Sequence, residues 1–98
     1  MQKKTPFDIV GYGAVAVDDI LYIEHYPESD TKVEVSHRER QGGGLIGTGL
    51  VTAARLGVKA AYFGSLGDDE LSIFTREAFI KEGIDISKVI NIPDAKPI

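Results

Sequence analysis

Two groups of residues in this sequence have the types and spacing to bind a polar ligand. One is Asp18, the first of an acidic doublet that follows the Gly-rich end of an apolar stretch. The other is a run of three glycines, Gly42, Gly43 and Gly44, with Thr48 shortly behind it. A carboxylate accepts strong hydrogen bonds from hydroxyl groups, and glycine lets backbone N–H groups approach a ligand without a side chain in the way. Together they indicate a candidate ligand site.

Each feature also has a plain structural interpretation. Asp18 also fits the role of capping a loop next to Asp19, which is the weaker candidate for a ligand contact. The three glycines also fit a flexible hinge. With Gly47 they match the Gly-x-Gly-x-x-Gly pattern, but the Lys-Ser/Thr of a phosphate-binding loop is missing, which disfavours a nucleotide site. Thr48 also fits a helix residue that bonds its own backbone.

The hydrophobic pattern predicts strands that alternate with helices. Residues 7–15 and 58–64 have the β-branched and aromatic composition of main strands, and a third main strand is expected between Ile84 and Ile92. Residues 20–23 and 31–35 predict two short strands around a turn, which would form a projecting hairpin. The order of elements predicts an α/β domain with a parallel βαβαβ sheet.

Two helices are expected to cover this sheet. Residues 45–56 are apolar or small nearly all round, which favours a helix buried against the sheet over a helix on the surface, and Gly57 is expected to end it. The second helix is expected to start at an acidic pair with a capping role, Asp68 and Asp69, of which Asp68 is the expected N-cap. Its buried stripe would consist of Leu71, Phe74, Ala78 and Phe79.

Composition sets wider limits. The chain has 98 residues, 43% of them hydrophobic and 27% charged, which suits one ordinary globular domain. A net charge of -4 argues weakly against nucleic acid. The sequence contains no cysteine, which excludes disulfides and thiolate metal sites, and no His or carboxylate spacing marks a metal site. Residues 1–6 are polar and no apolar region follows them, so no signal peptide is expected. No apolar run approaches the ~20 residues that a membrane-spanning helix needs. A cytoplasmic location without membrane contact is expected.

Three motifs in this order resemble the N-terminal part of the ribokinase-like (PfkB) carbohydrate kinases. The first is Gly13-Ala14-Val15-Ala16-Val17-Asp18. The second begins at Gly43-Gly44, runs through a helix containing Thr48 and reaches Ala54-Arg55-Leu56-Gly57. The third is Ser65-Leu66-Gly67-Asp68-Asp69, followed by a helix and the segment EGIDIS. The resemblance covers roughly residues 7–95. It departs from the family at Thr48, where an Asn is usual, and at Ile46 and Leu50, where small residues are usual.

The resemblance implies a partial ribokinase-like domain, with residues 7–17 and 41–98 in the α/β body and 18–40 in a β lid. Asp18, Gly42, Gly43, Gly44 and Thr48 would bind a sugar or related polyol. The family's C-terminal motif, with its catalytic base and anion hole, has no counterpart here, so no catalytic residue is expected in this chain. ATP and Mg²⁺ would serve the full-length family member, and neither is expected to bind this chain alone. A homodimer through the lid hairpin is a further expectation.

Three functions therefore remain open at this point. The chain is the substrate-binding part of a sugar or nucleoside kinase, inactive alone. Alternatively it is a dimerisation or regulatory module derived from that family. A third interpretation is an unrelated nucleotide-binding α/β domain.

Overall fold

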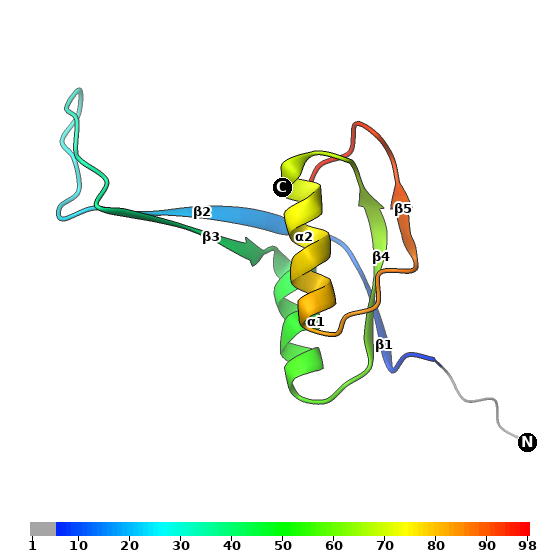
Figure 1. Ribbon diagram of the computed structural model, residues 1–98. Coiled ribbons are helices and arrows are strands. Elements are labelled where there is room, and N and C mark those ends of the chain that lie inside the picture. Colours follow the sequence, from blue (N-terminus) through cyan, green and yellow to red (C-terminus); the bar gives the residue numbers. More distant parts are fainter. Residues whose placement is uncertain (1–5) are drawn as a thin grey trace, which may run out of the picture.

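A computed structural model describes residues 6–98 of the chain (Figure 1). Most of the N-terminal stretch in which no signal peptide is expected, residues 1–5, lies outside the described residues. The body of the molecule is a parallel sheet in the order β1-β4-β5, formed by β1 (Ile9–Tyr12), β4 (Ala60–Leu66) and β5 (Val89–Asn91). The helices α1 (Leu45–Arg55) and α2 (Glu70–Lys81) connect these strands. The expected α/β class with a parallel βαβαβ sheet is confirmed.

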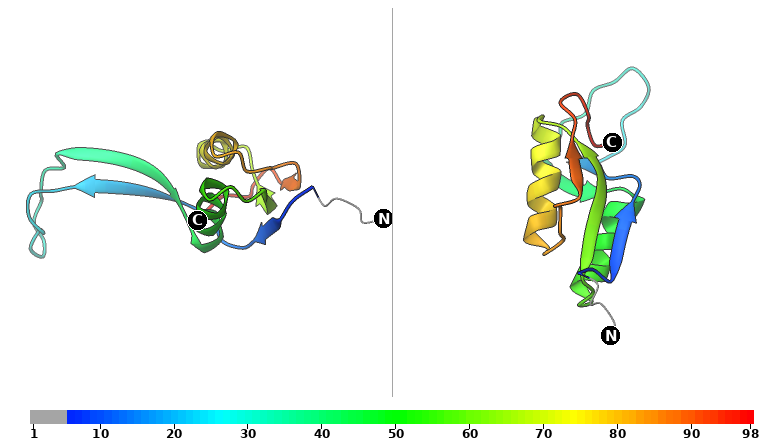
Figure 2. Two further views of the ribbon diagram at one scale, coloured as in Figure 1. Left: turned by 90° about the horizontal axis from the view of Figure 1, so that it is seen from below. Right: turned by 90° about the vertical axis from the view of Figure 1, so that its right-hand side faces the viewer.

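Both helices lie on the same face of the sheet (Figure 2). This follows from the strand order, because two successive right-handed crossovers that move in one direction place their helices on one side. Between helices and sheet lies the core, in which Tyr62 of β4 and Phe79 of α2 approach with ring centroids 5.3 Å apart. Gly11 of β1 has no side chain, and this lets Ile46 and Leu50 of α1 approach the strand closely.

A β-hairpin projects from this body (Figure 1). Its strands β2 (Ala16–Tyr22) and β3 (His37–Gly43) are antiparallel, with Ala16 opposite Gly43 and Tyr22 opposite His37. The hairpin was expected, but the prediction of a strand at residues 31–35 is wrong, because these residues belong to the loop between the strands. The second strand is instead the charged stretch that begins at His37. Strand pairing here overrides the low β-propensity of charged residues and glycine.

The C-terminal residues return to the base of this hairpin. The N–H group of Ile98 donates to the carbonyl oxygen of Val15 at 3.0 Å, and the N–H group of Val17 donates to that of Ile98 at 2.7 Å. The free edge of β2 is therefore paired at the residue that precedes Asp18. This pairing helps to fix the backbone from which the Asp18 side chain extends.

Two details of the helices differ from the sequence predictions. Helix α1 packs on the sheet as expected, with Gly47 and Leu50 buried, but two of the apolar residues expected to be buried, Leu45 and Leu56, are 86% and 79% exposed. The reason is that the described elements packed on this helix, chiefly β4, β3 and β1, do not cover these two side chains. The N-cap of α2 is Asp69 and not Asp68, because the Asp69 carboxylate accepts a hydrogen bond from the N–H group of Ser72.

The buried stripe of α2 also differs from the expected one. It consists of Ser72, Thr75 and Phe79, whereas Leu71, Phe74 and Ala78 are only half-buried. Small hydroxyl-bearing residues fit this position because the helix lies close to the end of β4. There the Ser72 hydroxyl oxygen accepts a hydrogen bond from the N–H group of Gly67 at 3.0 Å.

The face of the sheet opposite the helices carries exposed apolar side chains, among them Val10, Tyr12, Phe63 and Ile90. Tyr12 is 74% exposed and stacks on Phe63 with ring centroids 5.5 Å apart. Parallel sheets are normally covered on both faces, and an open apolar patch promotes association. We expect a polypeptide of these 98 residues alone to elute from gel filtration as oligomers or aggregates. A monomer with a cooperative unfolding transition would contradict this expectation.

Candidate functional site

The candidate site lies where the hairpin joins the body, and a single glycine makes that junction possible. Strand β3 ends at Gly43, and Gly44 turns the chain into α1 with φ 87 and ψ 153. This backbone conformation is essentially restricted to glycine. A Cβ atom on Gly44 would also lie 2.6 Å from the carbonyl oxygen of Ala14. The chain leaving β1 and the chain entering α1 therefore touch at this point.

Gly43 is where the structure brings two of the predicted site residues together. Asp18 on β2 leans over Gly43 on β3, so that a Cβ atom added to Gly43 would lie 2.6 Å from Asp18 Oδ2. The bare backbone of Gly43 thus makes room for the Asp18 carboxylate. This is a different use of glycine from the close approach of a ligand that the sequence predicted. The proximity of Asp18 to the glycine run, on which the idea of a shared pocket depended, is present.

The other two glycines serve different purposes. Gly42 has no atom within 4 Å of the place where a Cβ would stand, so space around it is open. Gly44 is fixed by its backbone conformation. In addition, Gly42 and Gly43 belong to the paired strand β3, so the alternative interpretation of the three glycines as a flexible hinge is wrong for these two. Of the three glycines, Gly42 alone leaves open space at its Cα.

Two N–H groups in the first turn of α1 are already hydrogen-bonded within the chain. The N–H groups of Ile46 and Gly47 both donate to the carbonyl oxygen of Ala14, at 3.1 and 3.3 Å. A helix N-terminus binds anions through such free N–H groups, and here these two are already used. These two N–H groups are therefore not free to bind a ligand in this structure.

A groove of about 730 Å³ runs between the hairpin base, α1 and α2. Gly42, Gly43 and Thr48 are among the residues that line it, together with the apolar side chains of Val51 and Phe79. Asp18 is not among the residues that line this groove, although its carboxylate lies against Gly43. Thr48, Gly42 and Gly43 thus line the same groove, whereas the Asp18 carboxylate contacts Gly43 without lining that groove.

A second hollow, of about 310 Å³, lies at the carboxyl ends of β1 and β4. It is lined by residues that include Tyr12, Gly13, Ser65 and Lys96. The hydroxyl of Tyr62 donates to the carbonyl oxygen of Gly13 at 3.3 Å, and burial raises the pKa of Tyr62. Ligands of open α/β sheets bind beyond the carboxyl ends of the strands. This hollow and the hairpin base therefore bracket the region where a ligand is expected.

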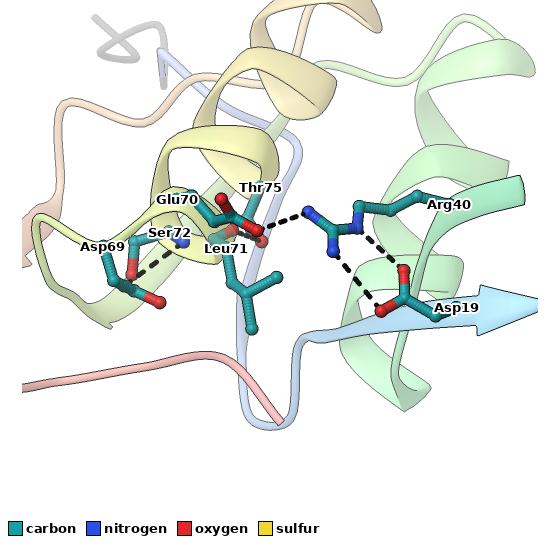
Figure 3. A network of polar contacts seen from close by, with 7 residues as sticks. All are labelled: Asp19, Arg40, Asp69, Glu70, Leu71, Ser72 and Thr75. Carbon is teal, nitrogen blue, oxygen red and sulfur yellow. Dashed lines mark hydrogen bonds and ion pairs between the residues drawn. The ribbon is translucent and has the colours of Figure 1, made fainter.

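The principal charged network near the site could not be predicted from local sequence patterns (Figure 3). Arg40 on β3 donates to both carboxylate oxygens of Asp19 on β2, at 2.8 and 3.3 Å, and to Glu70 Oε1 on α2 at 3.0 Å. Its hydrogen bond to Asp19 holds the pKa of that carboxyl below its usual range. The sequence pattern around Arg40 gives no sign of these contacts. The network could have been found only from the true register of β3, which pairs Asp19 with Arg40.

On the other face of the hairpin, Tyr22 donates to Glu39 Oε2 at 3.0 Å, and Gln41 donates to Glu39 Oε1 at 3.2 Å. Hydrogen bonds from Gln41 and then Tyr22 lower the pKa of Glu39. Within residues 6–98, no group of three His, Asp or Glu side chains could hold a metal ion. In the same residues, no helix is both long and apolar enough to cross a membrane.

Comparison with known proteins identifies the family. The profile described as pfkB family carbohydrate kinase matches residues 7–98. The chain belongs to the pfkB family of carbohydrate kinases. The family resemblance predicted from the three motifs is therefore confirmed.

Members of this family that match the chain differ in their named activities. The chain is 36% identical over 87 residues to 5-dehydro-2-deoxygluconokinase from Clostridium perfringens, a match that covers 89% of this chain and 25% of that protein. It is 26% identical over 87 residues to a nucleoside kinase from Methanothermobacter thermautotrophicus, covering 89% of this chain and 28% of that one. The chain thus spans about a quarter of the length of the curated relatives it matches.

The solved structures agree on the fold. Arabidopsis thaliana ribokinase, in complex with ribose and ATP, superposes with a TM-score of 0.76 and 19% identity. The superposition covers 94% of this chain and 30% of that one. At 19% identity, this structural similarity shows that the chain has the ribokinase fold and nothing beyond the fold. The expected fold class, a ribokinase-like α/β body with a projecting hairpin, is confirmed.

Proposed function

We propose that this chain forms the substrate-binding part and the lid of an ATP-dependent kinase that phosphorylates a hydroxyl group of a sugar. The proposal rests on family membership and on one observation, the Asp18 carboxylate held against Gly43 at the base of the hairpin. Two carboxylate oxygens can accept hydrogen bonds from two adjacent hydroxyls of a polyol. In this role Asp18 orients the sugar, and the hairpin covers it.

Thr48 and the open space at Gly42 support the same site from the groove side. Thr48 is exposed on α1 and supplies a hydroxyl that can donate and accept. Gly42 leaves room for a ligand to reach the backbone of β3. A hairpin that closes over a bound sugar would exclude water, which favours phosphoryl transfer to the sugar over hydrolysis.

The residues at the hairpin base offer few free partners for the phosphates of a nucleotide. Phosphate groups require free backbone N–H donors or cationic side chains. The N–H groups of Ile46 and Gly47 are bonded to Ala14, and Arg40 is bonded to two carboxylates. ATP and Mg²⁺ would supply the transferred phosphoryl group from outside this part of the structure.

The test is a phosphorylation screen of the natural polypeptide, expressed from its whole reading frame, with ATP and a panel of sugars and nucleosides. With the preferred sugar, Asp18→Asn should raise KM about tenfold, because an amide accepts hydroxyl hydrogen bonds less strongly than a carboxylate and places an NH₂ group at one of the two acceptor positions. Asp30→Asn is the control, since Asp30 lies in the exposed hairpin loop. Equal kinetics for both variants would refute the role of Asp18.

Two alternatives are separated by the same screen. The match to a nucleoside kinase favours a nucleoside as acceptor, and preferential phosphorylation of a nucleoside would establish it. A dimerisation or regulatory module predicts no phosphorylation of any acceptor by the natural polypeptide. It also predicts self-association that depends on exposed hairpin side chains such as Leu21 and Tyr22.

A further inference from the structure

Alternation along β2 places the two acidic residues of the doublet on opposite faces of the hairpin. Successive side chains of a strand point to opposite faces, so Asp18 and Asp19 have separate environments. Asp18 lies over Gly43, whereas Asp19 lies opposite Arg40 in the strand register. A change in the tilt of the hairpin on the Asp19 face must therefore move Asp18 on the other face.

Arg40 carries two contacts of different kinds (Figure 3). Its Nε and Nη2 atoms hold the Asp19 carboxylate within the hairpin, and its Nη1 atom reaches Glu70 in the first turn of α2. Among the side-chain hydrogen bonds of residues 6–98, the bond between Arg40 and Glu70 is the one that joins the hairpin to a helix. The guanidinium group can do this because it presents donors in a rigid planar fork.

The two contacts differ in how readily they open. Asp19 faces Arg40 directly across the strand pair, and its side chain is 47% exposed. Glu70 belongs to a different element and is 78% exposed, so water and salt compete strongly for its carboxylate. The ion pair of Arg40 with Glu70 is therefore expected to break first, while the ion pair of Arg40 with Asp19 remains within the hairpin. A weak contact is suitable for a hairpin that must open and close over a ligand.

We infer that Arg40 is a latch that holds the hairpin against α2 through Glu70 and thereby sets the position of Asp18. Its effect on hairpin position stands by itself, and its effect on sugar binding rests on the proposed function. Arg40 is a positioning residue in this scheme, since it acts on the substrate through Asp18. Breaking the ion pair between Arg40 and Glu70 should make the position of the hairpin relative to α2 more variable. It should weaken sugar binding with little effect on the chemical step.

The physical test measures the position of the hairpin relative to α2 in the natural polypeptide. Any natural cysteine is first replaced, so that only the two introduced cysteines carry spin labels. Spin labels at Ser29→Cys in the hairpin loop and Glu77→Cys on α2 report the distance between them by pulsed electron paramagnetic resonance. The wild type should give a narrow distance distribution. Arg40→Gln and Glu70→Gln should each broaden it. Unchanged distributions would overturn the latch.

The matched control is Arg38→Gln, which removes the same charge from the same face of β3, with no hydrogen bond to α2 among the described contacts. It should leave the distance distribution narrow. Equal broadening by Arg38→Gln would show that net charge, and not the contact with Glu70, holds the hairpin. That result would also overturn the latch.

The kinetic test uses the same variants with the preferred sugar. Arg40→Gln and Glu70→Gln should raise the sugar KM about three- to tenfold while kcat changes less than twofold, and the double variant should be no worse than Arg40→Gln. Arg40→Lys should fall between wild type and Arg40→Gln, because lysine cannot hold both carboxylates in a planar fork. Multiplying effects, or an unchanged KM, would refute the latch. A polypeptide with the expected distances that phosphorylates no acceptor would instead refute the proposed function.

Discussion

Replacing Gly43 by alanine is expected to raise the sugar KM of the natural polypeptide about 30- to 100-fold with little change in folding stability. The new methyl group would stand 2.6 Å from Asp18 Oδ2, which is closer than a Cβ can remain. The atom that must yield is the end of a flexible side chain, so the fold survives and the carboxylate moves away. Gly43 has no positive φ, so alanine adds no backbone strain. Steady-state kinetics and a thermal melt measure the two effects.

A double-mutant cycle shows whether Gly43 acts through Asp18. If the glycine only seats the carboxylate, Gly43→Ala should add little to the defect of a variant that already carries Asp18→Ala. Gly42→Ala serves as the comparison, because its methyl group meets no protein atom within 4 Å. It therefore measures the effect of crowding the ligand alone. Fully multiplicative effects of Gly43→Ala and Asp18→Ala would contradict the seating role.

Much of the body was predictable because its signals are local. The apolar and small residues of α1 with Gly57 at its end fixed that helix to within one residue, and Gly57 has the positive φ of 90 expected of a helix-ending glycine. Strands alternating with these helices predicted the parallel sheet. The exposure of Leu45 and Leu56 was not predictable in the same way. It depends on what packs against the helix, and helical periodicity carries no information on that.

The hairpin register was the part that local signals could not supply. Residues 31–35 have better strand propensity than the charged stretch that follows, yet β3 begins at His37. Register depends on which residues face each other across the pair, and a single chain gives no direct measure of this. Once the register was wrong, the pairing of Asp19 with Arg40 could not be seen. The candidate site was therefore predicted correctly in its nearest contact, Asp18 with Gly43, and incompletely in its charged surroundings.

Replacing Gly44 by alanine is expected to lower the free energy of unfolding by about 3 kcal/mol or more, the largest effect on stability that we predict. Two causes add at this residue. Its φ of 87 and ψ of 153 lie in a region essentially closed to residues with a side chain. The new Cβ would also lie 2.6 Å from the carbonyl oxygen of Ala14 and 2.8 Å from Val15 Cα. These are backbone atoms that cannot move without displacing β2.

The matched control for this prediction is Gly49→Ala in the middle of α1. No atom lies within 4 Å of the added methyl group, and Gly49 has no positive φ. Alanine should therefore stabilise the helix by up to about 1 kcal/mol, as it does in exposed helix interiors. Urea denaturation of the natural polypeptide measures both variants. A Gly44→Ala protein as stable as the wild type would show that the junction between hairpin and helix is not strained. The tight contact of Gly44 with Ala14 could then not be what fixes the hairpin, and with it Asp18, on the body.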